Sequence, residues 1–187
     1  SPHIQKMRQF LKPLKGPYSI NYRINAGFLD SNHWVNDYEI GGGRIIGEVC
    51  HFLDLCNFIS SSQVLSWKIS YLDSQSSDSR IIILKYKNGS IATISYFTNG
   101  SSELSKERLE VFCDNHTVII DDFLKSEFYT NDKQKNYTTR NQDKGQREMI
   151  KKYMQGLKNN GKSIINFDEI IKVSKLAIDL DNYRKSL

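Results

Sequence analysis

Cysteine is scarce in this sequence, and the number of cysteines is odd. The 187 residues include Cys50, Cys56 and Cys113, with no Cys-x-x-Cys pair. An odd number without paired spacing argues against a disulfide framework and against a structural zinc site. Two of the three stand among apolar residues. We therefore expect reduced core thiols in a cytoplasmic protein, and no metal.

Long apolar runs and prolines are also few. No run approaches the roughly 20 residues of a membrane span, and the start, Ser1-Pro2-His3-Ile4-Gln5, lacks the form of a signal peptide. Three prolines with 39% hydrophobic and 25% charged residues are typical of a globular chain rather than a disordered one. A length of 187 residues fits one domain with a sizeable core. We predict one domain without a membrane partner.

The positive charge of the chain is not gathered in a purely basic cluster. The formal net charge is +5, which by itself would suit nucleic acid or a membrane surface. The densest basic region, residues 133–152, also contains Asp143 and Glu148. Neither a known nucleic-acid module nor a platform of aromatic and basic residues is present. We therefore expect no nucleic-acid partner.

The chain is organised around a triple glycine followed by a mostly apolar helix. Gly41–Gly43 allow a tight turn, and residues 44–59 are apolar for long enough to form a helix that is buried on most sides. Arg44, Glu48 and His51 interrupt the apolar pattern. At about 100° per residue they lie within roughly 60° of one another on one helix face.

Two interpretations of this polar face stay open on the residues alone. Asp54 extends the face by a further turn. Ionisable groups cost free energy to bury unless they pair with each other or with a ligand, so the face is a candidate for chemistry. In the structural alternative, Glu48 pairs with Arg44, His51 is a hydrogen-bonded core residue, and Asp54 caps a nearby group. Pocket-lining and structural side chains share these spacings.

Several segments alternate apolar and polar residues, as half-buried strands do. Tyr18 to Ala26 is the first, and it places Arg23 and Asn25 on one face. Lys87-Asn88-Gly89-Ser90 predicts a hairpin turn, because Asn-Gly accepts positive φ. Asn131 to Lys144 is predicted as a polar, mobile loop. The other predicted strands are Gln63 to Leu72, Arg80 to Tyr86, Ile91 to Phe97, Leu109 to Cys113, Thr117 to Ile120 and Phe123 to Tyr129.

Helices are predicted at both ends of the chain. Ser1 and Pro2 begin the first helix, and Pro13 ends it. Because this helix begins without any preceding fold, we expect the chain to be a piece of a longer protein. Residues 149–157 form an amphipathic helix, and Asn166 caps the last one. The predicted buried stripe of that last helix is Ile170, Ile171, Val173, Leu176, Ala177, Leu180 and Tyr183. The pattern predicts an α+β domain with a largely antiparallel open β-sheet and helices packed on one face.

The segment between Gly27 and Ile40 has no clear period and is rich in polar and aromatic residues. His33, Trp34 and Asp37 stand in it, next to the triple glycine. Such a segment resembles a binding loop. The alternative is that Trp34 covers an edge of the core.

Three familiar motifs fit poorly. The spacing Gly41-x-Gly43-x-x-x-Gly47 would suit a dinucleotide only if a buried parallel strand fed it, and residues 36–40 are too polar for that. A zinc site is improbable because the adjacent Cys50 and His51 point to different helix faces. No Gly-x-Ser-x-Gly elbow of a serine hydrolase is present.

The central stretch resembles the substrate-side, C-terminal domain of the Gfo/Idh/MocA oxidoreductases. Members of that family carry a triple glycine, then an Asp, a His four residues later and an Asp three residues beyond. Here the matching residues are Gly41–Gly43, His51 and Asp54. The resemblance covers nearly the whole chain. Residues 22–27 with residues 43–52 resemble the branch that is fused behind a zinc-alcohol-dehydrogenase-like half and is often linked to polysaccharide or nucleotide-sugar metabolism.

The resemblance implies a fold and a reaction. It implies that residues 1–187 are a dihydrodipicolinate-reductase-like C-terminal domain for substrate binding and oligomerisation, without the N-terminal Rossmann domain. That missing domain would hold most of the NAD or NADP, with Gly43 and Gly47 facing the cofactor from this side. The reaction would move a hydride between the nicotinamide and a carbinol carbon of a sugar, cyclitol or nucleotide sugar. This piece alone should do no redox chemistry.

The resemblance also implies site residues. His51 would be the base that removes the hydroxyl proton, or the partner of that base, with Glu48 orienting it or tuning its charge. The residues implied to hold substrate hydroxyls or a phosphate are Arg44, Asn25, His33, Trp34, Asp37 and Asp54. One departure matters, because the catalytic Asp of the family falls at Gly47 here. The competing hypothesis is a non-catalytic module whose polar helix is structural. In both hypotheses the open sheet face is expected to form a homo-oligomer.

Overall fold

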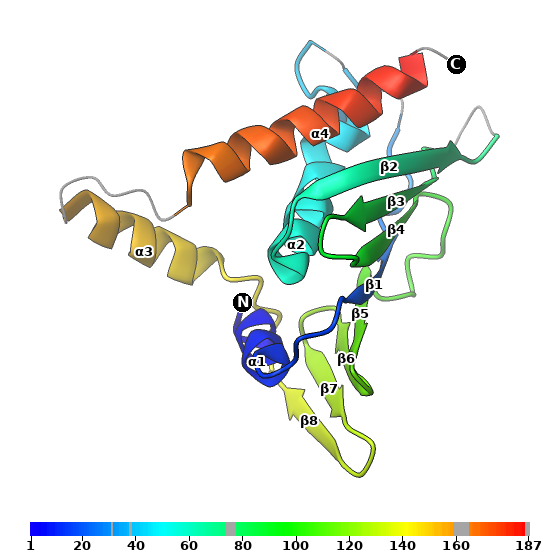
Figure 1. The fold of residues 1–187 in the computed structure, drawn as a ribbon. Helices are drawn as coiled ribbons and strands as arrows, with labels where there is room; N and C mark the ends of the chain where they lie inside the picture. The colour runs from blue at the N-terminus through cyan, green and yellow to red at the C-terminus, as the bar shows by residue number, and fades with distance from the viewer. Residues whose placement is uncertain (31, 38, 74–77, 159–164, 186–187) are drawn as a thin grey trace.

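A single β-sheet organises the molecule (Figure 1). The computed structural model describes residues 1–30, 32–37, 39–73, 78–158 and 165–185. Within these residues the sheet has eight strands in the order β2 (Val64–Tyr71), β3 (Arg80–Tyr86), β4 (Ile91–Phe97), β1 (Ser19–Asn25), β5 (Glu107–Cys113), β6 (His116–Asp121), β7 (Lys125–Tyr129) and β8 (Gln134–Thr138). The helices are α1 (Pro2–Leu11), α2 (Cys50–Ser60), α3 (Gln146–Lys158) and α4 (Phe167–Lys185), with a 3-10 turn η1 (Trp34–Asn36) and a π-helical turn η2 (Ile45–Val49).

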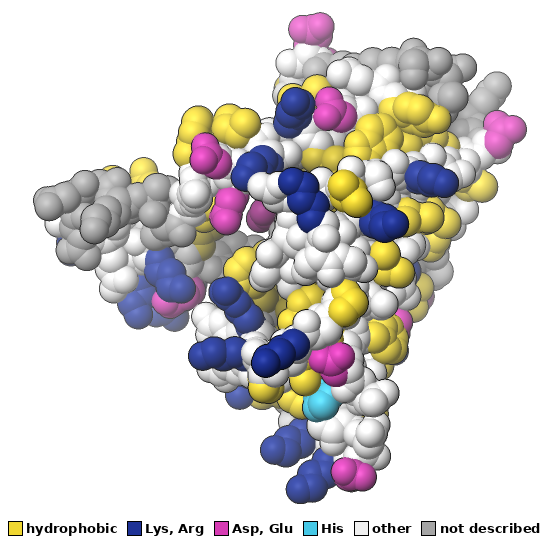
Figure 2. All heavy atoms as spheres, viewed as in Figure 1, with side chains coloured by type: hydrophobic (Ala, Val, Ile, Leu, Met, Phe, Trp, Pro, Cys, Tyr) yellow, Lys and Arg dark blue, Asp and Glu magenta, His cyan; other side chains and the backbone are white. Residues whose placement is uncertain are grey.

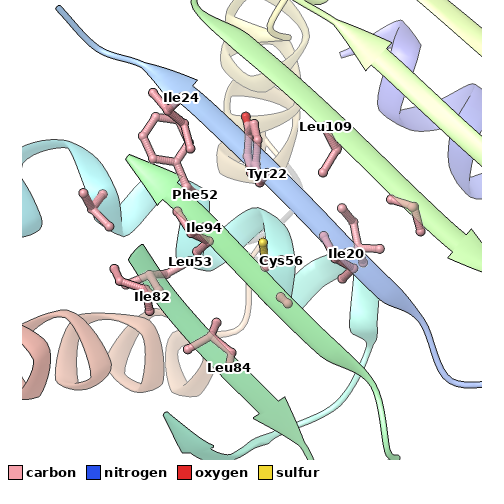
Figure 3. Packing of buried hydrophobic residues seen from close by; sticks show 14 of the residues in the cluster. Ile20, Tyr22, Ile24, Phe52, Leu53, Cys56, Ile82, Leu84, Ile94 and Leu109 are labelled. Atoms are coloured by element: carbon pink, nitrogen blue, oxygen red, sulfur yellow. The ribbon is translucent and has the colours of Figure 1, made fainter. Parts of the chain in front are cut away.

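The core lies between one face of the sheet and helix α2 (Figure 3). Ile20, Tyr22 and Ile24 of β1 are buried at every second position. On α2, Leu53 is fully buried, and the Phe52 ring meets the Tyr22 ring edge-on with 5.2 Å between centroids. The alternation of buried and exposed residues on the strands follows the pleat of a sheet that is covered on one face. The predicted α+β class with an open sheet and helices on one face is confirmed.

The central strand β1 is the exception to the antiparallel pairing. It pairs with β5 antiparallel and with β4 parallel, from Ser19 opposite Ile91 to Asn25 opposite Phe97. All other neighbours in the described sheet are antiparallel. The hairpin signals in the sequence did not predict the parallel pair, because they identify only strands that follow one another along the chain.

Two predictions about the C-terminal half were wrong. The loop predicted for residues 131–144 contains β8, whose side chains are polar and mostly exposed, so it pairs with β7 through its backbone without an apolar pattern. On α4 only the second half of the predicted stripe is buried, at Leu176, Ala177 and Leu180. The exposed members of that stripe include Ile170, Ile171 and Tyr183.

Among the described helices, none is both long and apolar enough to cross a membrane.

The predicted Asn88-Gly89 turn and the predicted Asn166 cap are confirmed. Gly89 has φ +86° in the β3–β4 hairpin, and the Ser90 amide donates to Asn88 Oδ1 at 3.1 Å. The Asp168 amide donates to Asn166 Oδ1 at 3.0 Å at the start of α4. These local signals succeed because they depend on a few neighbouring residues only.

Helix α1 is held to the sheet by a buried histidine. His3 is fully buried, with Nδ1 2.6 Å from Ser126 Oγ and Nε2 3.1 Å from Thr139 Oγ1. Its ring lies 4.9 Å from the Tyr137 ring, centroid to centroid. Burial lowers the pKa of His3 below its ordinary value, because the charged imidazolium loses its water.

The folded protein should therefore lose stability in mild acid through His3. Since the folded pKa of His3 is lowered, the unfolded chain takes up the proton more readily. The contribution of His3 to the free energy of unfolding is complete above about pH 6.5. It falls by up to about 1.4 kcal/mol per pH unit as the pH drops toward and through the folded pKa. Urea unfolding between pH 7.5 and 5 measures this slope. The variant His3→Gln should flatten it and His33→Gln should not. An unchanged slope in His3→Gln would contradict the prediction.

Candidate functional site

The triple glycine forms a turn that is packed tightly against the loop before it. Gly42 and Gly43 have φ +69° and +80°, a region that side chains disfavour. A Cβ on Gly41 would overlap the Trp34 carbonyl oxygen and lie 2.5 Å from Val35 Cα. The turn thus locks the loop, through η1, onto the start of the helix.

Replacing Gly41 with alanine should destabilise the fold. The added methyl group meets backbone atoms, which cannot move aside as a side chain can, so the expected loss in unfolding free energy is about 1–3 kcal/mol. Chemical denaturation measures it. Gly156→Ala in the exposed helix α3 is the control, and it should be neutral or stabilising because alanine has the higher helix propensity. Equal effects of the two substitutions would contradict the prediction.

The helix after the turn begins with a π-helical turn, which alters the predicted face. The Cys50 amide donates to the Ile45 carbonyl, five residues back. The expectation of about 100° per residue from Arg44 to His51 assumed a regular α-helix. One extra residue in the turn shifts every later side chain around the axis. The face therefore divides into Arg44 and Glu48 before the shift, and His51 and Asp54 after it.

Arg44 and Glu48 form a mostly buried cluster with two residues from the sheet side. Arg44 Nη1 lies 3.2 Å from Glu48 Oε2 and donates to the Tyr96 hydroxyl at 3.0 Å. Arg44 Nη2 donates to the Gly27 carbonyl at 2.9 Å. The Tyr96 hydroxyl donates to Glu48 Oε2, and Lys106 Nζ lies 2.6 Å from Glu48 Oε1. The predicted Arg44–Glu48 pair is confirmed.

The cluster keeps Glu48 ionised. Burial by itself raises the pKa of this carboxyl, but hydrogen bonds from Lys106 and Tyr96 and the charges of Lys106 and Arg44 outweigh it, so the pKa is lowered. The pKa of Tyr96 is raised, first by burial and then by its bond to Glu48. Glu48 is therefore a fixed negative charge, and Tyr96 a neutral donor.

Asn25 and Arg23 hold the loop that delivers Lys106. Asn25 Nδ2 donates to the carbonyls of Ser101 and Leu104, at 2.7 and 3.1 Å. Arg23 Nη1 donates to the Ser105 carbonyl at 2.6 Å. The Asn25 Oδ1 atom is buried and has no hydrogen-bond partner in the part of the chain that the structure describes. These contacts give Asn25 a supporting position behind the cluster.

His51 and Asp54 lie on α2 beyond the cluster, and both are exposed. His51 Nδ1 is 3.9 Å from Cys50 Sγ, and none of the described residues forms a hydrogen bond with its Nε2. The core-histidine alternative is therefore wrong. The pKa of Asp54 is raised by desolvation first and by Glu169 of α4 second, while His51 lowers it. A carboxyl beside an imidazole can orient it and stabilise its charged form.

The loop before the glycine turn carries exposed side chains. Trp34 is 60% exposed, so the alternative in which it covers a core edge is wrong. The His33 ring lies 5.8 Å from the Trp34 ring, and its Nδ1 accepts a hydrogen bond from the Val35 amide at 3.3 Å. Asp37 Oδ1 accepts from the amides of Glu39 and Ile40 at 2.9 and 3.2 Å. His33 and Trp34 form an exposed aromatic surface.

The glycines offer little for a self-contained cofactor site. Gly43 is buried, whereas Gly47 is exposed on the π-helical turn. Among the described residues, no strand lies between β1 and the glycine turn, where η1 and turns stand instead. No group of three or more His, Cys, Asp or Glu residues in the described parts could hold a metal ion.

Sequence reasoning missed Tyr96 and Lys106. Tyr96 is a fully buried strand residue and looks like core, and Lys106 stands in a polar segment between strands. Neither has a local signal, because their partner Glu48 lies 48 and 58 residues away.

Solved structures share this fold. A dehydrogenase (MviM) from Clostridium difficile covers 97% of this chain at 16% identity and TM-score 0.75, over 58% of its own length. UDP-N-acetylglucosamine 3-dehydrogenase GnnA from Acidithiobacillus ferrooxidans covers 96% at 16% identity and TM-score 0.75, over 56% of its length. An NAD-binding protein from Listeria innocua covers 94% at 19% identity and TM-score 0.68, over 55% of its length.

At these identities the comparison establishes the fold. No family model matches the chain, and neither does a curated protein sequence. The chain spans less than two thirds of the length of each of these three structures.

Proposed function

We propose that this chain is the substrate-side half of a nicotinamide-dependent oxidoreductase of the Gfo/Idh/MocA family, acting on a sugar, cyclitol or nucleotide sugar in polysaccharide biosynthesis. The proposal rests mainly on one observation. An exposed His51 follows an ionised carboxylate, Glu48, on the helix that begins at the triple glycine. The shared fold with two dehydrogenases and an NAD-binding protein supports the reaction class. The sequence of residues 43–52 supports the branch fused to a zinc-alcohol-dehydrogenase-like half.

In this proposal, residues 1–187 are one domain, and a Rossmann domain elsewhere in a longer protein holds most of the NAD or NADP. Bound there, the cofactor would supply the hydride chemistry. Gly47 is exposed and is proposed to face the cofactor, while the place of its missing side chain is taken by the Gly41 carbonyl oxygen, 3.2 Å from where a Cβ would stand. Gly43 lies buried below it and shapes the turn.

His51 takes the hydroxyl proton of the substrate on Nε2 in this mechanism. Glu48 supplies a fixed negative charge to the site, and Asp54 stabilises the imidazolium that forms. His33, Trp34 and Asp37 form the substrate wall, in which the exposed Trp34 ring can stack on a sugar. The buried contacts of Arg44 and Asn25 support a positioning role for these two predicted substrate ligands.

A thermal-shift screen tests the proposal. The natural protein that contains this chain is screened against NAD(H), NADP(H) and a panel of sugars, cyclitols and nucleotide sugars, and the 187-residue chain is screened in parallel. A cofactor at 100 times its Kd should stabilise the natural protein by about 2.7 kcal/mol, with a sugar adding to it. The 187-residue chain should not respond to the cofactor. No response of the natural protein to either cofactor would overturn the proposal.

The second candidate is a non-catalytic module, and the open sheet face favours an assembly role that suits both candidates. Ile81 and Ile83 of β3, Ile91 of β4 and Phe112 of β5 are 38–48% exposed. They belong to the face that the helices leave uncovered. Apolar side chains gathered on an open sheet suit association with a second copy.

Replacing Ile83 with glutamate should therefore weaken self-association. A charge buried at the centre of an apolar contact is expected to raise the dimer dissociation constant at least about 30-fold, or 2 kcal/mol. Light scattering across a dilution series measures it on the natural protein. Ile40→Glu, in the loop before the glycine turn, is the control for added charge. A dimer that survives Ile83→Glu unchanged would exclude this face.

A further inference from the structure

Helix α3 presents its whole apolar stripe to solvent. Met149, Ile150, Tyr153, Met154 and Leu157 are each 50–58% exposed, and α3 has no buried residue. Helix α1 differs, since Met7 and Leu11 are buried against the body. Figure 1 shows α3 standing away from the sheet. The stripe is therefore an amphipathic face without a partner among the described residues.

A helix of this length needs that partner. The 13 residues of α3 are about the minimum for a marginal helix in water, where tertiary packing normally supplies the stability. Apolar side chains are also exposed at the start of α4, where Phe167, Ile170 and Ile171 are 69%, 44% and 50% exposed. The buried residues of α4 lie in its second half. Both helices thus leave apolar side chains uncovered.

The polar side of α3 does not compete for this contact. Lys151 and Lys152 are exposed on the opposite side of the helix axis, as is Gln155. Figure 2 shows Lys and Arg side chains over the α3 region. A partner that covered the stripe would leave these charges in water.

We infer that α3 and the first turns of α4 dock onto the nucleotide-binding domain of the longer protein. This inference rests on the proposed function. The matched structures extend beyond the shared part by two fifths or more of their length, which is room for such a domain. The Ser1 backbone nitrogen lies against Gly145, directly before α3. Ser1 therefore lies beside the start of the helix that carries the stripe.

Hydrogen exchange tests the docking on the natural protein, with the 187-residue chain as the comparison. The amides of residues 149–157 should exchange about 100-fold more slowly in the natural protein, because docking removes the helix from local opening. Tyr153→Glu places a charge in the stripe and should abolish that protection. Gln155→Glu adds the same charge on the polar side of the same helix and should keep it.

The outcomes separate this inference from the proposed function. Equal exchange of α3 in both proteins overturns the docking, and calorimetric binding of NAD(H) or NADP(H) then decides the proposed function independently. Protection that appears only at concentrations where the protein dimerises assigns the stripe to a second copy and also overturns the inference. Slow exchange at all concentrations, lost in Tyr153→Glu and kept in Gln155→Glu, supports it.

Discussion

Turnover by the natural protein is expected to fall by about 10²- to 10⁴-fold when His51 is replaced by alanine, the range for loss of a general base. His51 is exposed and forms no strong hydrogen bond with the described residues, so the fold should remain intact, within about 0.5 kcal/mol of the parent in unfolding free energy. The measurement is kcat/KM with the cofactor and sugar that the thermal-shift screen identifies, together with a urea titration of the same variant.

A second histidine provides the matched control for His51→Ala. His116 lies at the start of β6, with its ring edge-on to Phe10 and its Nδ1 2.7 Å from the Asp114 carbonyl oxygen. His116→Ala removes the same ring and should leave kcat/KM of the folded enzyme unchanged. If His51→Ala instead lowered stability and left kcat/KM intact, the histidine would be structural, and the non-catalytic module would be the better account.

Replacing Glu48 with glutamine is expected to lower the free energy of unfolding by about 2–4 kcal/mol. The Arg44 side chain is only 4% exposed, and Glu48 is its one carboxylate partner among the described residues. Removing that charge leaves a buried guanidinium uncompensated, which is far costlier than the loss of a surface pair. Arg44 Nε already has no hydrogen-bond partner among the described residues, so no other contact there offsets the lost charge. Chemical denaturation at pH 7 measures the loss.

An exposed ion pair gives the control for Glu48→Gln. Glu110 pairs with Arg108 at 2.9 Å on β5, where the Arg108 side chain is 39% exposed. Glu110→Gln should cost no more than about 1 kcal/mol, because solvent screens that pair. The stability difference between the two variants should also shrink in acid. Since the pKa of Glu48 is lowered, its contribution is complete above about pH 4.5 and is lost as the pH falls through the folded value. Equal losses at pH 7 would contradict the prediction.

Much of the fold could be predicted from the sequence because its signals are local. The ranges Arg80–Tyr86 and Ile91–Phe97 agree with β3 and β4, since period-2 alternation with an Asn-Gly turn specifies a hairpin. The triple glycine and the apolar run after it specified a turn and a buried helix. Strand β8 was missed because backbone pairing at a solvated edge leaves no apolar pattern.

The candidate site was predicted only in part. The Arg44–Glu48 pair has helical spacing and was predictable, and so was the presence of His51 on the same helix. The position of His51 around the helix axis relative to Glu48 was not predictable, because the π-helical turn changes the angle between the two side chains. Asn25 was predicted as a substrate ligand, yet its amide nitrogen holds the loop at Ser101 and Leu104.

The sequence by itself determined the fold class, the strands with strong alternation, the glycine turn and the types of residue that meet there. Each of these depends on residues within one or two turns of one another. Only the tertiary structure decided that β1 pairs with β4 in parallel, that Tyr96 and Lys106 surround Glu48, and that the stripe of α3 stays uncovered. Such contacts join residues dozens of positions apart, and their free energy comes from burial and charge pairing that exist only once the sheet has assembled.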